Sequence, residues 1–251
     1  MLDPLSVLRL GPGLVILGGA HTTTVAMAAI RALDLSTLSA ATVAVTPSAA
    51  LPGVQQTIVR DLDAQLPMLD QVLLMDPDLV YVERLHRPAL ADRVFRAAES
   101  KRVLTTVTAE SCLGMVAQLQ ALDISSERLL QQGPTLQVQK RIRRLCRSCR
   151  RLTTVSGDDM GRRIPTVVYE AVGCARCGGT GFKGWCFAAE RLTPGLSTEG
   201  RALRRGLRKG LTGGPLREAV EAAGLVSLQQ DAVRLALTGL IDHRDLVHLA
   251  V

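Results

Sequence analysis

Four cysteines in two pairs could together hold a metal ion. The pairs are Cys146-Arg-Ser-Cys149 and Cys174-Ala-Arg-Cys177, and 24 residues separate them. The two-residue spacing lets both thiolates of a pair reach one tetrahedral ion, and four sulfur ligands favour Zn²⁺ in a closed, structural site. We therefore predict one zinc ion on Cys146, Cys149, Cys174 and Cys177, because such regular spacing argues against four unrelated buried thiols.

The remaining candidate groups are weaker. Cys112 and Cys186 lie outside the pairs, and Cys112 follows a strand-like run, as a small buried apolar residue would. The four histidines are expected to be solvated or packed rather than catalytic. They are His21, His86, His243 and His248.

A basic run at residues 140–151 carries much of the formal net charge of +7. Such a run predicts an anionic partner: nucleic acid, an acidic protein or a membrane surface. A zinc ribbon that binds nucleic acid is one interpretation. The chain's six aromatic residues leave little for base stacking, which favours a solvated face or a surface for an acidic partner subunit.

Size and composition indicate one large α/β domain with a small appendage. The chain has 251 residues, and 47% of them are hydrophobic. It has no secretory signal pattern and no apolar stretch near the roughly 20 residues of a membrane span. Paired cysteines of this metal-binding type fit a reducing compartment, so we expect a cytoplasmic location.

Unbroken apolar segments alternate with helical patterns in the first half of the chain. This alternation predicts a mainly parallel sheet covered by helices on both faces. A helix end and the turn Asp76-Pro77-Asp78 precede one of the strands. The expected strands are residues 13–17, 41–45, 79–82 and 102–107, and the expected helices are residues 22–35, 89–98 and 113–122.

The second half is expected to be helical around the cysteine segment. A helix at residues 136–145 is expected to lead into the first cysteine pair, and residues 156–165 are expected to form a loop. Helical periodicity predicts helices at residues 215–223 and 228–240 and a short last helix at 243–250.

Several motifs resemble, in the same order, those of one family. Arg143-Arg-Leu-Cys-Arg-Ser-Cys149 is similar to R-R-L-C-x-x-C, and Gly173-Cys-Ala-Arg-Cys-Gly-Gly-Thr-Gly-Phe-Lys-Gly184 to G-C-x-x-C-x-x-T-G-Y-K-G. Further matches are Leu51-Pro-Gly-Val-Gln55, Asp76-Pro77-Asp78, Glu190 and Ser227-Leu-Gln-Gln-Asp231. On these residues the chain resembles the C-terminal domain of the ATPases that drive type II secretion and type IV pilus assembly (GspE/PilB-like).

The resemblance implies a RecA-like fold of the P-loop NTPase type, with a tetracysteine zinc insertion. We accordingly expect a RecA-like α/β core with a degenerate nucleotide site at residues 1–145, a tetracysteine zinc module at 146–190 and a helical C-terminal region at 191–251. Relatives carry an additional N-terminal domain, so this chain is expected to be a standalone remnant or to be completed by a separate chain.

The phosphate-binding loop of the family is altered here. Its G-x-x-x-x-G-K-[ST] pattern supplies backbone N–H groups, a lysine and a hydroxyl for Mg²⁺. The corresponding segment is Gly18-Gly19-Ala20-His21-Thr22, which is shorter and has His21 where the lysine belongs. Thr22 and a helix N-terminus remain as a weak anion site. The resemblance thus implies ATP and Mg²⁺ as ligands, whereas the altered loop argues against both.

The other nucleotide motifs are also changed. The acidic E-D-P segment aligns with Val45-Thr46-Pro47, and Arg84 takes the position of the catalytic glutamate, although a one-residue slip brings Glu83 there. Thr108 replaces the histidine of a further segment. Because phosphoryl transfer needs positioned cations, metal and a water-orienting group, these losses predict an inactive ATPase.

Two functions therefore follow from the resemblance. The first is an inactive relative with a structural or regulatory part in a secretion or pilus motor. The second is a weak ATPase that works only inside a mixed ring, with Glu83 as its catalytic candidate. The implied partners are copies of this chain, an intact secretion ATPase and the inner-membrane platform protein, which allows a peripheral place at that membrane.

Overall fold

The structure is a computed structural model that describes residues 11–155, 166–194 and 197–249. The chain forms two compact units. We name the first the sheet unit, which comprises Met1–Val138 and Arg191–Leu225, and the second the cysteine unit, which comprises Gln139–Glu190 and Val226–Val251. Within the described ranges, no helix is both long enough and apolar enough to span a bilayer.

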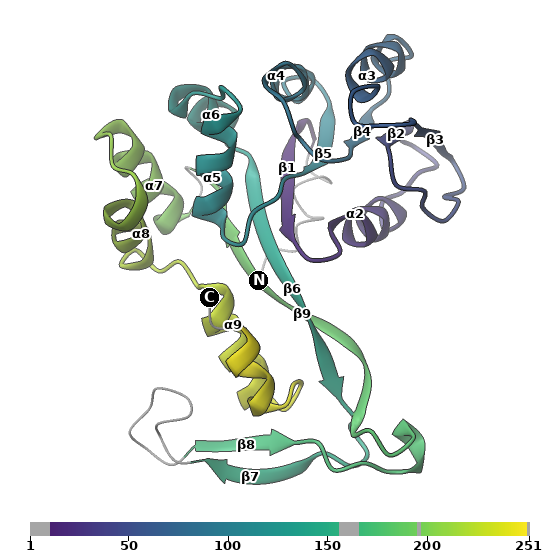
Figure 1. Ribbon diagram of the computed structural model, residues 1–251. Helices are drawn as coiled ribbons and strands as arrows, with labels where there is room; N and C mark the ends of the chain where they lie inside the picture. Colours follow the sequence, from purple (N-terminus) through teal and green to yellow (C-terminus); the bar gives the residue numbers. More distant parts are fainter. Residues whose placement is uncertain (1–10, 156–165, 195–196, 250–251) are drawn as a thin grey trace. The chain divides into compact units, whose positions relative to one another are not determined.

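The sheet unit is built on parallel strands. The strand order in the sheet is β3-β2-β4-β5-β1-β6-β9 (Figure 1). The pairs β1–β5, β2–β3, β2–β4 and β4–β5 are all parallel. The strands are β1 (Gly13–Gly19), β2 (Ala40–Ala44), β3 (Val54–Ile58), β4 (Leu79–Val82), β5 (Arg102–Thr106), β6 (Thr135–Leu145) and β9 (Phe182–Leu192), and the last two run from one unit into the other.

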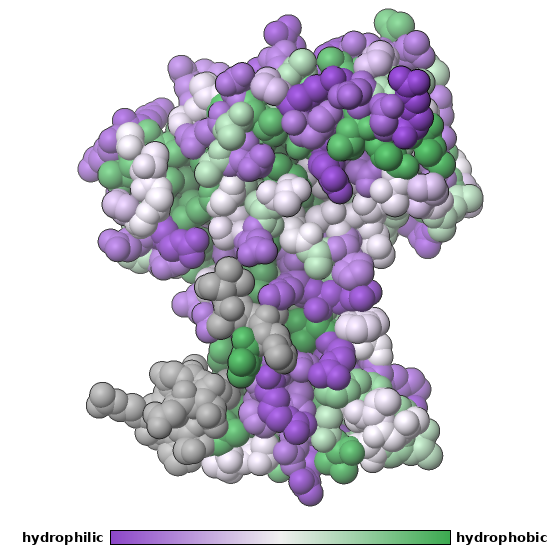
Figure 2. Space-filling view, in the orientation of Figure 1, coloured by the Kyte–Doolittle hydropathy of each residue, from purple (hydrophilic) through white to green (hydrophobic). Residues whose placement is uncertain are grey.

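The central strands are buried on both faces, which is why their sequences are continuously apolar. β4 is fully buried, and β1 is buried from Leu14 to Gly18. Helix α2 lies on one face of the sheet, and α3 and α4 lie on the other (Figure 1). Val15, Leu17 and Ile30 belong to the apolar cluster between the sheet and α2. Hydrophilic side chains are frequent on the outer surface around α3 and α4, with some hydrophobic ones among them (Figure 2).

The helices of the sheet unit begin with recognisable local signals. Pro88 lies at the first position of α4. An N–H group at this position would have no partner within the helix, so proline, which lacks one, is tolerated there. Ser111 and Ser125 cap α5 and α6 by accepting backbone N–H groups. The helices are α2 (Thr22–Arg31), α3 (Gln65–Leu74), α4 (Pro88–Ala97), α5 (Cys112–Ala121), α6 (Ser126–Gln132), α7 (Thr198–Arg208) and α8 (Gly213–Glu221).

The cysteine unit combines the tetracysteine segment with the C-terminal helix. β7 (Arg151–Val155) and β8 (Thr166–Glu170) form an antiparallel pair, and a short 3₁₀ helix, η2 (Ala175–Cys177), follows. α9 (Leu228–Leu237) and the 3₁₀ helix η3 (His243–Leu249) complete the unit. Apolar side chains of this C-terminal segment pack with apolar side chains of β6 and β9 in one cluster. The cluster is formed by Ile142, Ala188, Ala232, Leu235, Ala236, Ile241 and Leu246.

The predicted α/β class with a mainly parallel sheet is confirmed, but one predicted helix is wrong. Residues 136–145 form strand β6 instead. Leu136, Val138 and Ile142 fall at even positions and are buried, so the pattern has the period of two that a strand requires. The expected loop at 156–165 lies outside the described residues.

The two units also differ from the three predicted segments. The last helix belongs with the tetracysteine segment, whereas α7 and α8 belong with the sheet. Strands β3, β7, β8 and β9 and helix α6 are additional to the predicted elements, and α7 lies in the predicted helical C-terminal region.

Candidate functional site

The four paired cysteines come together in the cysteine unit. The sulfur atoms of Cys146, Cys149, Cys174 and Cys177 all lie within 4.8 Å of one another. The Sγ atoms of Cys149 and Cys177 are 3.8 Å apart, as are those of Cys174 and Cys177. A tetrahedron with metal–sulfur distances of about 2.3 Å has edges of roughly 3.8 Å. This cluster could therefore hold a tetrahedral metal ion.

Tight turns bring each pair to the cluster. The carbonyl of Cys146 accepts the N–H groups of Cys149 and Arg150, and the carbonyl of Cys174 accepts that of Cys177. The glycines beside the second pair allow close packing. A Cβ atom at Gly173 would collide with the carbonyl of Gly179, and φ at Gly173 is 111°, which disfavours other residues.

Backbone N–H groups point at the sulfur atoms. Cys177 Sγ accepts the N–H groups of Cys174 and Gly181, both at 3.2 Å. Burial raises the pKa of the Cys177 thiol, but these N–H groups and the neighbouring thiols outweigh it and lower the pKa to about 6. The fold therefore stabilises a thiolate at Cys177, which is the form that binds metal.

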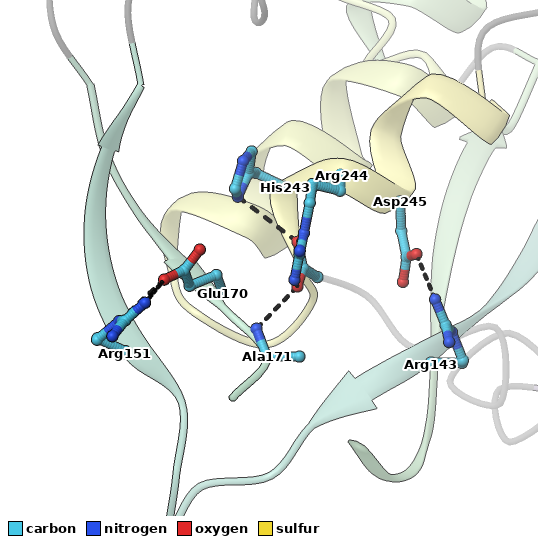
Figure 3. A network of polar contacts seen from close by, with 8 residues as sticks. Arg143, Arg151, Glu170, Ala171, His243, Arg244 and Asp245 are labelled. Carbon is cyan, nitrogen blue, oxygen red and sulfur yellow. Dashed lines mark hydrogen bonds and ion pairs between the residues drawn. The ribbon is translucent and has the colours of Figure 1, made fainter. Parts of the chain in front are cut away.

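Polar contacts tie the C-terminal segment to the tetracysteine segment, and those of Ala171 and Arg244 (Figure 3) are both made to Asp242. This side chain is 1% exposed and accepts the backbone N–H of Ala171 at 2.8 Å and the guanidinium of Arg244 at 2.6 Å. Burial raises the pKa of Asp242, but hydrogen bonds from Arg244 and Ala171 lower it to about 2. Arg143 of β6 also pairs with Asp245 of η3 at 2.8 Å.

A second link joins α9 to the cysteine turns. The guanidinium of Arg150, directly after the first pair, donates to the carbonyl of Gly239, and Leu145 N–H donates to the carbonyl of Leu240. Gly239 packs so closely on Tyr169 that a Cβ atom there would lie 2.5 Å from the ring. The cysteine cluster and the end of α9 are therefore parts of one compact unit.

The predicted phosphate-loop residues lie between β1 and α2 in the sheet unit. Gly18 and Gly19 end β1, and His21 is the N-cap residue of α2. His21 has φ 56° and ψ 34°, is exposed and makes no side-chain cap. Thr22 begins the helix. The structure therefore has a strand–turn–helix arrangement here, with the imidazole of His21 at the helix start.

Glu83 lies at the carboxyl end of β4, next to the start of α2. Its Oε2 accepts the backbone N–H groups of Val45 and Thr46, at 2.7 and 2.8 Å, and its Oε1 accepts the Thr23 hydroxyl at 3.3 Å. Burial raises the pKa of Glu83, but hydrogen bonds from Thr46, Val45 and Thr23 outweigh it and keep the pKa below its usual value.

The other aligned residues have different surroundings. Arg84 is exposed, has φ 49° and donates its backbone N–H to the Thr106 hydroxyl at 2.8 Å. Thr108 is exposed in the segment after β5. Asp78 lies at the opposite end of β4 from Glu83, where it accepts the N–H and hydroxyl of Ser39.

Two residues of these sites were not found from the sequence. Thr23 follows Thr22 in a run of three threonines, so no pattern singles out its contact with Glu83. Asp242 contacts Ala171 across 71 positions of the chain, a pairing that only the fold makes evident.

Curated relatives align with more than half of the chain. The chain is 30% identical, over an alignment of 251 residues, to the type II secretion system protein HxcR of Pseudomonas aeruginosa. This alignment covers 95% of the chain and 49% of that protein. It is 25% identical over 205 residues to the type IV pilus assembly ATPase PilB of Thermus thermophilus, covering 76% of this chain and 22% of that protein. The chain thus spans half or less of the length of these relatives.

A solved structure has the same fold. The ATPase DotB of Legionella pneumophila superposes with a TM-score of 0.63 at 14% identity, covering 99% of this chain and 63% of that one. The family model described as "Type II/IV secretion system protein" matches residues 18–202, which is more than half of the chain. The β1–α2 turn, the strands from β2 to β9 and the motifs around the cysteine pairs fall within this match. The chain therefore belongs to the type II/IV secretion system protein family.

Proposed function

We propose that this chain is a structural or regulatory component of a secretion or pilus machine and does not hydrolyse ATP. One observation carries the proposal: the carboxylate of Glu83 at the carboxyl end of β4 accepts hydrogen bonds from the chain's own backbone, beside a turn that lacks lysine. The relatives' names place them in type II secretion and type IV pilus assembly.

The β1–α2 turn lacks the charge that phosphoryl transfer needs. The start of α2 offers N–H groups and the positive end of a helix dipole, which attract an anion. No lysine or arginine occurs between Gly18 and Ile30, so no cation from this segment can neutralise a triphosphate. A neutral imidazole at His21 does not replace a lysine near pH 7.

Glu83 is also poorly suited to activate water. A general base works best when its pKa lies near the operating pH. Hydrogen bonds from Val45, Thr46 and Thr23 lower the pKa of Glu83 below its usual value, so the carboxylate is a weak base. Those three donors also take up most of its capacity to accept a proton or a metal ion.

A second candidate function is weak hydrolysis inside a mixed ring with an intact ATPase. The observation in its favour is the presence of one carboxylate, Glu83, within hydrogen-bond distance of Thr23 in the first turn of α2. In such a ring, a neighbouring subunit would have to supply the missing cations. The nucleic-acid alternative has less support, because arginine side chains already cover one face of three rings in the cysteine unit.

The cysteine cluster is proposed to hold one structural Zn²⁺. Four thiolates in tetrahedral spacing favour zinc and leave no open position for a substrate. When bound, the ion would crosslink the two turns and so stabilise the whole cysteine unit. We further propose that the chain assembles with copies of itself or with an intact ATPase, and at the inner-membrane platform of the machine.

Phosphate release from Mg-ATP tests the proposal. The chain alone should give no hydrolysis above background, and mixing it with an intact ATPase of the family should give only the rate of that ATPase. The informative variant is Glu83→Ala. A rate increase in the mixture that Glu83→Ala abolishes would establish the mixed-ring function instead.

A further inference from the structure

One face of the cysteine unit carries exposed aromatic and cationic side chains. Trp185 and Phe187 are two residues apart on β9, so they lie on the same side of the strand. They are 52% and 38% exposed. The Arg141 guanidinium of β6 lies over the Trp185 ring, 4.1 Å from its centroid. We call these three residues the tryptophan face.

The opposite side of the same strands is already covered. Ile142 and Ala188 alternate with the residues of the tryptophan face, and both are buried in the apolar cluster with α9 and η3. Cys186, between Trp185 and Phe187, packs against that cluster as well. Within the described part of the cysteine unit, the helices therefore cover one side of β6 and β9 and leave the tryptophan face exposed.

Nearly all of the chain's excess positive charge belongs to the cysteine unit. This unit holds 13 Lys and Arg against seven Asp and Glu, whereas the rest of the chain holds 17 against 16. The excess of six positive charges falls to four if the four cysteines bind one Zn²⁺ as thiolates. Hydrophilic side chains run along β6 and β9 (Figure 2).

Many of these cations have no acidic partner within the unit. Arg143, Arg151, Arg234 and Arg244 form ion pairs. Among the residues described, six other cationic side chains have no carboxylate within 4.0 Å. Each of these six contacts a backbone carbonyl, a hydroxyl group or an aromatic ring, or faces solvent. These are Arg141, Arg144, Arg147, Arg150, Arg176 and Lys183.

We propose that the tryptophan face binds an acidic segment of a partner protein, one that carries apolar residues between its carboxylates. Charge complementarity selects an acidic partner, because the unit has cations in excess and few carboxylates. Tryptophan and arginine are among the residues that most often dominate the energy of a protein interface. Phe187 adds an apolar contact that a purely ionic surface would lack.

A protein fits this face better than a nucleic acid. Base stacking needs free aromatic faces. Arg141, Arg143 and Arg150 lie over the rings of Trp185, Phe182 and Tyr169, with the guanidinium carbon 4.0–4.6 Å from each ring centroid. The acidic partner would belong to the machine proposed above, and only this biological setting rests on the proposed function. The binding itself does not depend on it.

Trp185 is the chain's single tryptophan, so its fluorescence reports on this face alone. The full chain is titrated, without nucleotide, with a 15-residue peptide of Glu-Glu-Leu repeats. We expect a saturable change in Trp185 emission and an affinity that falls as salt is raised. Arg141→Glu should weaken binding by roughly tenfold or more. Arg217→Glu, the same charge change on an exposed residue of α8, should leave binding within about twofold.

A second pair of probes tests the apolar contact. A peptide of Glu-Glu-Ser repeats should bind the parent chain more weakly, and Phe187→Ala should remove most of the difference between the two peptides. Equal weakening by Arg141→Glu and Arg217→Glu, or no emission change, would overturn the proposal.

Nucleic acid and membranes are tested as alternative partners of the same chain. Tighter binding of a 15-nucleotide oligo(dT) than of the Glu-Glu-Leu peptide, lost in Arg141→Glu, would make the face a nucleic-acid site and overturn the proposal. Cosedimentation with phosphatidylglycerol vesicles that depends on Arg141 would overturn it in favour of a membrane. Because no ATP is present, each result is independent of whether the chain binds ATP.

Discussion

The carboxylate of Glu83 accepts the backbone N–H of Thr46 at 2.8 Å, so the end of β4 is bound to the segment that follows β2. Val45 donates to the same oxygen at 2.7 Å. This is the segment with which the family's acidic motif is expected to align. The Glu83 carboxylate therefore stabilises the segment after β2 in this chain.

Replacing Glu83 should cost stability in a pH-dependent way. Glu83→Ala removes the acceptor for two N–H groups and should lower the free energy of unfolding by roughly 1–3 kcal/mol at pH 7. Glu83→Gln should cost less, because the amide oxygen still accepts. Urea unfolding monitored by circular dichroism gives both values.

The pH dependence has a defined sign. Folding lowers the pKa of Glu83, so its contribution is present above the unfolded value of 4.5 and is lost as the pH falls through the folded pKa. The difference between the parent chain and Glu83→Gln should therefore shrink below pH 4.5. A difference that grows in acid would contradict this account.

Zinc content should depend on the four paired cysteines and not on Cys186. Elemental analysis of the purified chain should give one zinc per chain. Cys174→Ser should lower zinc content and the unfolding temperature of the cysteine unit, because the ion joins the two turns. Cys186→Ser is the matched control in the same unit and should keep the zinc. Full zinc content in Cys174→Ser would rule out the proposed ligand set.

Asp242 should hold the C-terminal segment in place. Asp242→Ala leaves Ala171 N–H and Arg244 without their acceptor and should destabilise the cysteine unit by roughly 1–3 kcal/mol. Hydrogen exchange should accelerate at Ala171 and in α9. Because folding lowers the pKa of Asp242 to about 2, its contribution should be complete above pH 3.8 and fade between pH 3.8 and 2. Unchanged exchange at Ala171 would contradict this role.

Gly239 should tolerate no side chain. Its φ is 69°, and a Cβ atom would lie 2.5 Å from the Tyr169 ring, so Gly239→Ala should cost roughly 1–3 kcal/mol in the free energy of unfolding. Gly214→Ala is the control, because a Cβ atom there meets nothing within 4 Å. Equal unfolding midpoints for both variants would disprove the close packing.

The sheet unit could be predicted from the sequence because its strands are short apolar runs. β1, β2, β4 and β5 are buried on both faces, and burial is what such runs indicate. β3 escaped prediction because it lies at the edge of the sheet, and its sequence VQQTI is largely polar. β6 was mistaken for a helix because its basic residues mask the alternation of Leu136, Val138 and Ile142.

The cysteine cluster was predictable from spacing, whereas its surroundings were not. Two pairs with the same spacing identify Cys146, Cys149, Cys174 and Cys177 as neighbours without knowledge of the fold. The attachment of α9 through Asp242 depends on residues 71 positions apart, and no local pattern encodes such a distance. The contact between Glu83 and Thr46 likewise arises only when β2 and β4 pair.

Calorimetric titration of the full chain with Mg-ATP tests the central claim most directly. The claim is that the β1–α2 turn and Glu83 no longer form a nucleotide site. The account predicts no saturable heat with up to millimolar Mg-ATP, and the same baseline for Glu83→Ala. Saturable binding of Mg-ATP in the parent chain that is lost in Thr22→Ala would contradict it.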